Sequence, residues 1–87
     1  LMATLHLSAD QKQHVLLKGA PEEILLRCDV DEKTKLAGLK KVDELAIEGM
    51  RVLAFAKKTE KSHLLSLGEE EIKKGFVFLG FVGMSDP

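Results

Sequence analysis

The chain has 87 residues, which is enough for one small domain with a single modest core. Its net charge of −1 provides no basic surface for nucleic acid or for an acidic membrane, so neither is an expected partner. No apolar stretch is long enough to cross a bilayer, so we expect no direct membrane contact by this chain. Cys28 is the only cysteine, which excludes an internal disulfide and fits a reducing, cytosolic compartment.

The first third of the chain predicts a hairpin followed by a short helix. Apolar residues recur at every second position over residues 1–7, which is typical of a half-buried strand. Residues 13–18 form a second predicted strand, and the polar segment 8–12 is the expected turn between the two. Pro21 is favoured at a first helical position, and the two glutamates after it suit the positive end of a helix dipole. We therefore expect a helix over residues 21–28.

A second, longer helix is expected between residues 31 and 48. Asp31 is a suitable N-cap, and Gly49 is a natural terminator because glycine readily adopts the left-handed conformation after a last helical turn. The apolar stripe of this helix consists of Leu36, Leu39, Val42, Leu45 and Ala46.

The last third predicts two further strands. Residues 50–56 are rich in apolar side chains, whereas residues 57–62 are polar and are expected to form a loop. Ser66, with a glutamate three residues later, has capping-box spacing for a short helix that Gly75 would close. Residues 76–82 are apolar at nearly every position, so both faces of that strand should be covered. The order β-β-α-α-β-α-β predicts an α+β fold, a mainly antiparallel sheet flanked by helices.

The sequence contains no recognisable catalytic or metal-binding constellation. Lys18 precedes its glycine instead of following a glycine-rich loop, so the spacing of a P-loop is absent. His6, His14 and His63 are isolated along the chain and lack metal-ligand spacing, so no metal site is expected.

Two cations stand beside predicted strand ends, where they could together hold a phosphate chain. Lys18 ends the second strand before Gly19, which allows a ligand to approach the backbone, and Arg51 opens the third strand. Met2 and Leu53 would offer an apolar face to a flat ring. Each exposed charge contact would contribute only about 1 kcal/mol. A lysine extended over apolar surface and an ordinary surface arginine are the alternative interpretations, and the pattern alone does not choose.

Four stretches resemble, in order, segments of the cation-transporting P-type ATPases. Residues 18–22 resemble the family's KGAPE segment, and residues 49–56 resemble its G-x-R-V-L-A-x-A strand. Residues 78–87 resemble the strand and Asp-Pro hinge that leave the nucleotide-binding domain. Residues 2–4 match the strand that follows the family's Phe-Ser-x-x-Arg-Lys segment. Together the four stretches extend over essentially the whole chain.

The resemblance implies the C-terminal part of a P-type ATPase nucleotide-binding domain. Residues 1–83 would belong to that domain, and residues 84–87 would begin the hinge toward the phosphorylation domain. In the family this is a cytoplasmic domain of an integral membrane protein, and it binds ATP, as Mg-ATP in the parent. The phosphate would pass to an aspartate in a domain absent from this chain, so the chain alone should be inactive. The implied partners are ATP and the phosphorylation domain of the same protein.

The resemblance also implies a set of site residues but no catalytic residue. Lys18 would line the adenine side of the pocket, Arg51 would reach the phosphates, and Leu53 would pack near the base. The implied nucleotide-binding residues are Met2, Lys18, Gly19, Ala20, Arg51 and Leu53. The family's adenine-stacking aromatic residue and an acidic pocket residue lie upstream of this sequence. Two alternatives therefore stay open: a structural scaffold without nucleotide binding, and a small ferredoxin-like regulatory module that binds a ligand.

Overall fold

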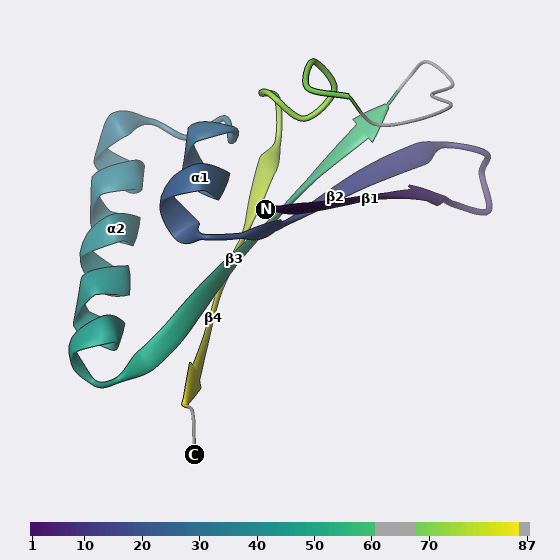
Figure 1. Ribbon diagram of the computed structural model, residues 1–87. Coiled ribbons are helices and arrows are strands. Elements are labelled where there is room, and N and C mark those ends of the chain that lie inside the picture. The colour runs from purple at the N-terminus through teal and green to yellow at the C-terminus, as the bar shows by residue number, and fades with distance from the viewer. Residues whose placement is uncertain (61–67, 86–87) are drawn as a thin grey trace.

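The computed structural model describes residues 1–60 and 68–85. It contains β1 (Met2–Leu7), β2 (Gln13–Gly19), α1 (Pro21–Leu26), α2 (Glu32–Ile47), β3 (Met50–Glu60) and β4 (Val77–Ser85). The strands form one antiparallel sheet in the order β1-β2-β3-β4, and both helices lie in the connection between β2 and β3 (Figure 1). The predicted α+β class is confirmed, and these strands and helices follow in the predicted order.

The ends of the helices follow local signals in the sequence. Pro21 begins α1 at the first helical position, as predicted. The carboxylate of Asp31 accepts a hydrogen bond of 2.7 Å from the backbone N–H of Thr34, and thereby caps the start of α2. Gly49 follows α2 with a φ of 84°, which side chains rarely allow, and turns the chain into β3.

The core lies between the helices and one face of the sheet. Its fully buried members are Val15, Leu17, Ile24, Leu25, Ala54, Ala56 and Phe76. Helix α2 contributes less than predicted, because only Leu39, Val42 and Leu45 of its apolar stripe are half-buried. Leu36 is 59% exposed and Ala46 is also exposed, so the prediction was wrong for these two residues. The helix lies against β3 with a narrower face than its sequence indicates.

Strand β3 is longer than predicted, because the polar segment after residue 56 continues it as far as Glu60. Lys58 and Glu60 form an ion pair of 3.1 Å, and the Lys58 ammonium lies 4.8 Å from the ring centroid of Phe76. These tertiary contacts satisfy polar side chains that, in the sequence, indicate a loop. The prediction of a loop was therefore wrong up to residue 60, and residues 61–62 lie outside the described residues.

Strand β4 is covered on one face only, which contradicts the prediction that both faces are covered. Val77, Leu79 and Val82 are 57%, 51% and 47% exposed, because both helices lie on the other side of the sheet. On the helix side Phe78 and Phe81 pack edge to face, with ring centroids 4.9 Å apart.

Two basic side chains donate hydrogen bonds to the backbone of the segment before β4 and connect it to the rest of the fold. Within the described residues 68–75 it forms turns, and the predicted helix would start at Ser66, outside the described residues. Arg27 donates a hydrogen bond of 2.9 Å to the carbonyl of Ile72, and Lys58 donates one to the carbonyl of Glu71. None of the helices in the described residues is long and apolar enough to span a membrane.

Candidate functional site

The face of the sheet that points away from the helices is the candidate site, and we call it the open face. It consists of the strand residues that alternate with the buried ones. On β1, β2 and β3 these begin with Met2, His14 and Arg51, and on β4 they are the residues that pair with this side of β3. No helix of the described chain covers this face (Figure 1).

The strand register brings four residues of the open face into one row across the sheet. Met2 pairs with Lys18, Lys18 pairs with Phe55, and Phe55 pairs with Gly80. Gly80 has a φ of 138°, and the space that its side chain would occupy is empty. A β-bulge at this point leaves Leu79 out of the pairing with β3. The row therefore combines a cation, an aromatic ring and a hollow beside that ring.

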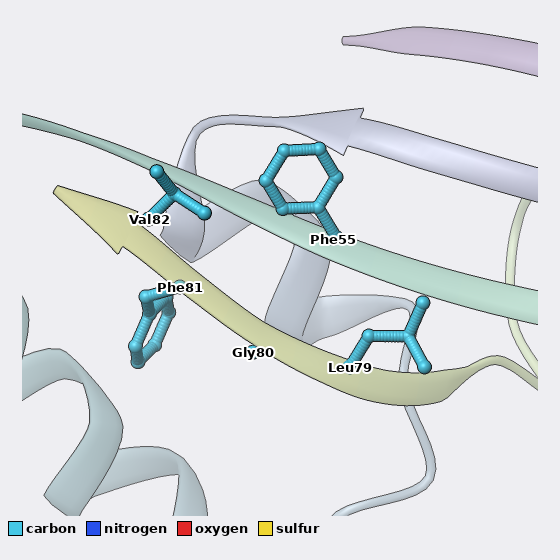
Figure 2. Close-up of a pocket in the computed structure, with 5 residues that line it drawn as sticks. All are labelled: Phe55, Leu79, Gly80, Phe81 and Val82. Atoms are coloured by element: carbon cyan, nitrogen blue, oxygen red, sulfur yellow. The ribbon is translucent and has the colours of Figure 1, made fainter. Parts of the chain in front are cut away.

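Phe55 forms the shared wall of two shallow hollows. The first is lined by Met2, Thr4, Leu16, Leu17, Lys18 and Phe55. The second is lined by Phe55, Leu79, Gly80, Phe81 and Val82. Figure 2 shows the side chains of Phe55 and Val82 on one side of the sheet, whereas Phe81 points to the opposite side, toward the helices. Both hollows are largely apolar, and the flat ring between them is suited to contact another flat ring.

The charges on the open face all have the same sign. Among its described strand residues the charged side chains are Lys18, Arg51 and Lys57, and no carboxylate lies on this face. The chain as a whole carries 13 basic and 14 acidic residues, so the acidic side chains are placed elsewhere. A cationic face with an apolar centre favours a ligand that joins a flat ring to an anion.

The structure brings some of the predicted site residues together and separates others. Met2 and Lys18 line one hollow, and Leu53 lies two residues from Phe55 along β3, opposite Val82. Arg51 lies four residues from Phe55, about 13 Å along the strand. The backbone positions of Lys18 and Arg51 are therefore well separated along the open face.

Gly19 and Ala20 lie beside the open face rather than on it. Gly19 is the last residue of β2 and is buried on the side of the helices, where an added Cβ would come within 3.1 Å of the Leu1 Cα. Ala20 is the N-cap residue of α1. They connect the strand to the helix without facing either hollow.

Sequence reasoning missed Phe55 as a site residue, although a signal for it existed. Alternation along β3 from Arg51 places residue 55 on the same face as Leu53. The chain has only four phenylalanines and no tryptophan or tyrosine, so an exposed aromatic position is rare here. Its place directly opposite Lys18 depends on the strand register, which the sequence does not show.

The histidines are isolated along the chain, but the strand register brings two of them together. His6 on β1 pairs directly with His14 on β2, which their spacing along the chain does not show. Within residues 1–60 and 68–85 no group of three or more metal-ligating side chains gathers. His63 lies outside the described residues.

Cys28 lies at the end of α1 and packs against the core cluster. Burial raises the pKa of its thiol above the ordinary value, and the neighbouring Asp29 carboxylate adds to this effect. The thiol therefore stays protonated and is a poor nucleophile near neutral pH.

The comparisons with known proteins match the chain to one family and to several of its members. The family described as "P-type ATPase, cytoplasmic domain N" matches residues 1–87. The cation-transporting ATPase pma1 of Synechocystis is 36% identical over 99% of this chain. Calcium-transporting ATPase 1 of Saccharomyces cerevisiae is 37% identical and that of Bacillus cereus 30% identical, each over 100% of this chain. The chain spans about a tenth of each of these relatives, 10%, 10% and 11% of their lengths.

An antiparallel sheet with helices on one face and an open, cationic face defines the molecule as an α+β domain with a surface available for a ligand. The match over its whole length identifies the family: the chain belongs to the P-type ATPase cytoplasmic domain N family.

Proposed function

We propose that the open face binds ATP, with the adenine ring against Phe55 and the phosphates extending toward Arg51. The row formed by Met2, Lys18, Phe55 and Gly80 is the observation that carries this proposal. Membership of the domain N family supports a nucleotide as the ligand, because the resemblance of this segment to the family implies ATP binding.

The centre of the row is suited to a purine base. Stacking of a base on an aromatic side chain contributes about 1–3 kcal/mol. Phe55 is half-buried, so its ring is held in place while part of its surface stays accessible. Lys18 stands beside it on β2 and Met2 continues the row on β1, which provides a polar edge and an apolar edge for the base.

The direction of the phosphates follows from the positions of the cations. Arg51 lies about 13 Å along β3 from Phe55, whereas Lys18 lies directly beside Phe55. A base stacked on Phe55 would therefore contact Lys18, and only a chain extending along β3 over Leu53 would reach Arg51. Gly19 and Ala20 would contribute by setting the position of Lys18 at the end of β2.

In the longer protein we propose that this chain serves a cation-transporting ATPase, as the names of its relatives indicate. ATP bound here would transfer its phosphate to an aspartate in a neighbouring phosphorylation domain, to which residues 84–87 would lead. The described residues contain no cluster of metal ligands, so magnesium would arrive with the ATP phosphates. The domain would lie on the cytoplasmic side of an integral membrane protein.

The test is an NMR titration of the 87-residue chain with ATP and, separately, with adenosine. We expect both ligands to shift the amide signals of Met2, Lys18 and Phe55, and ATP alone to shift that of Arg51. A folded chain whose signals do not move with either ligand would contradict nucleotide binding and favour a structural scaffold. The ferredoxin-like alternative is disfavoured by the topology, because both helices are consecutive and the strand order is β1-β2-β3-β4.

A further inference from the structure

A pair of histidines stands on the open face, away from the row around Phe55. His6 and His14 are directly opposite each other on β1 and β2. Side chains at opposite positions of an antiparallel pair have Cβ atoms about 5 Å apart. His6 is exposed and His14 is half-buried, so both imidazoles can be reached from solvent.

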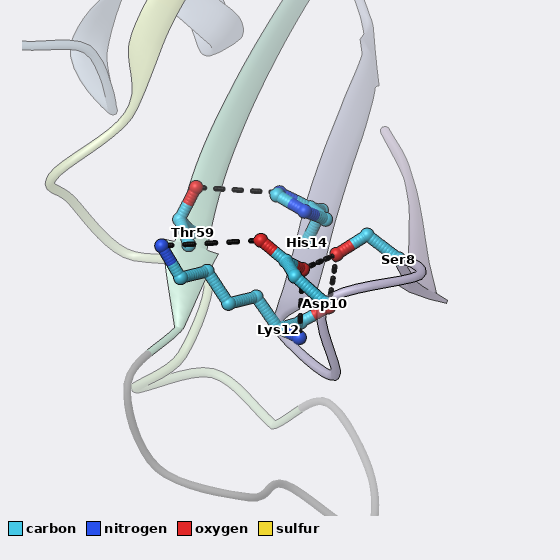
Figure 3. Close-up of polar contacts among 5 residues, drawn as sticks. All are labelled: Ser8, Asp10, Lys12, His14 and Thr59. Carbon is cyan, nitrogen blue, oxygen red and sulfur yellow. Dashed lines mark hydrogen bonds and ion pairs between the residues drawn. The ribbon is translucent and has the colours of Figure 1, made fainter.

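Each imidazole has one ring nitrogen held by a threonine hydroxyl. Nε2 of His6 lies 2.9 Å from Oγ1 of Thr4, two residues earlier on the same strand. Nδ1 of His14 lies 3.3 Å from Oγ1 of Thr59, its partner on β3 (Figure 3). The remaining nitrogens are Nδ1 of His6 and Nε2 of His14. In metal sites a histidine has one nitrogen on the ion and the other hydrogen-bonded to the protein, whereas here the bond to Thr59 turns the His14 ring toward β3, away from His6 on β1.

We infer that His6 and His14 together bind one divalent transition-metal ion of the kind that prefers imidazole, with Zn²⁺ as the representative. In tetrahedral Zn²⁺ sites the Zn–N distance is about 2.0–2.1 Å, which places two ligand nitrogens about 3.3 Å apart. Two imidazoles whose Cβ atoms are about 5 Å apart can converge to that separation once the His14 side chain turns from Thr59 toward β1. The described residues supply no third ligand, so water would complete the coordination. Two nitrogen ligands select against Ca²⁺ and Mg²⁺, which require oxygen.

The charges nearest to the pair are those of Lys57, whose partner Leu16 lies two residues from His14 on β2, and those of the adjoining turn. This turn carries Asp10 and Lys12, which form an ion pair of 3.9 Å with each other (Figure 3). His14 lies four residues from Lys18 along β2, about 13 Å from the row around Phe55. The metal site is therefore separate from the proposed nucleotide contacts, and it can be tested without ATP.

The experiment is a titration of the chain with Zn²⁺ alone, in a buffer free of chelators, followed by calorimetry and by the ¹⁵N signals of the imidazole rings. We expect one ion per chain and simultaneous shifts of the His6 and His14 ring signals. Two ligands on one rigid sheet act as a chelate, so His6→Gln or His14→Gln should each weaken binding by about tenfold or more.

His63→Gln is the matched control, because it removes the remaining histidine of the chain, and it should leave Zn²⁺ binding unchanged. Amide spectra of each variant establish that the sheet is intact, since glutamine at these accessible positions should not disturb the core. The inference is overturned if Zn²⁺ at millimolar concentration shifts neither ring. It is also overturned if each single variant loses less than about twofold, which indicates independent imidazoles, or if His63→Gln causes the same loss.

Discussion

Replacing Arg51 by alanine should separate phosphate recognition from base recognition. Arg51 lies about 13 Å along β3 from Phe55, so it would meet the phosphates of ATP but no part of adenosine. An exposed charge contact of this kind contributes about 1 kcal/mol. That free energy corresponds to about a fivefold change in Kd. We therefore expect Arg51→Ala to weaken ATP about fivefold and to leave adenosine affinity unchanged.

Lys57→Ala is the matched control, because Lys57 carries the same charge on the same strand and the same face. It lies on the other side of Phe55, six residues from Arg51, about 20 Å along β3. At an ionic strength of 0.15 M the Debye length is about 8 Å, so phosphates held near Arg51 would be screened from Lys57. Removing Lys57 should therefore change ATP affinity by less than about 1.5-fold.

The assay is a pair of NMR titrations for each variant, one with ATP and one with adenosine, at fixed ionic strength. Two results would refute the reasoning. Equal losses of ATP and adenosine affinity in Arg51→Ala would show that the arginine supports the fold or the base instead of the phosphates. Equal losses of ATP affinity in Arg51→Ala and Lys57→Ala would show that only the overall charge of the open face matters.

Three further predictions concern the base, the core and a helix cap. Phe55→Leu should weaken ATP and adenosine equally, by about 1 kcal/mol or more, in the same titrations, because it removes the stacking surface. Ile24→Val should lower the free energy of unfolding in urea by about 1 kcal/mol, whereas Ile47→Val should change it by less than about 0.5 kcal/mol, since these side chains are 0% and 86% exposed. The Thr34 hydroxyl and backbone N–H lower the pKa of Asp31, so its carboxylate adds stability that is lost on acidification. Asp31→Ala should therefore lower Tm at pH 7, and the difference in Tm between the variant and the unchanged chain should shrink below pH 3.8.

The parts of the fold that could be predicted depend on interactions within a few residues. Pro21 begins α1, Asp31 caps α2 through a hydrogen bond three residues ahead, and Gly49 ends that connection with a positive φ. The alternation in residues 1–7 likewise reports a strand that is exposed on one side. Such signals remain the same whatever the rest of the chain does, so they can be read directly from the sequence.

The composition of the site could be predicted only in part, because it depends on register. Lys18 and Phe55 are 37 positions apart in the numbering, yet they are direct neighbours on β2 and β3. Shifting that pairing by one residue would leave every local pattern intact and remove Phe55 from the row. His6 and His14 depend in the same way on the length of the turn between β1 and β2. The pairing of Lys18 with Phe55 therefore has no local signal, whereas that of His6 with His14 follows from the hairpin turn.

The errors about β3 and β4 have a common physical cause. Whether the face of a strand is covered depends on where the connecting helices lie, and both helices here follow β2 and lie on one side. Lys58 and Glu60 resemble loop residues in the sequence, but their charges pair with each other and the ammonium covers Phe76. Val77 and Leu79 resemble interior residues but lie on the uncovered side.

The proposed site also has a consequence for the folding kinetics of this domain. The row consists of two residues from the β1–β2 hairpin and two from the β3–β4 pair, and the contact between β2 and β3 closes the longest loop of the sheet. Closing such a loop costs more entropy than forming either pair alone, so we expect it late in folding. A nucleotide bound across this seam would stabilise only the complete sheet. It should therefore slow unfolding without speeding the formation of either strand pair.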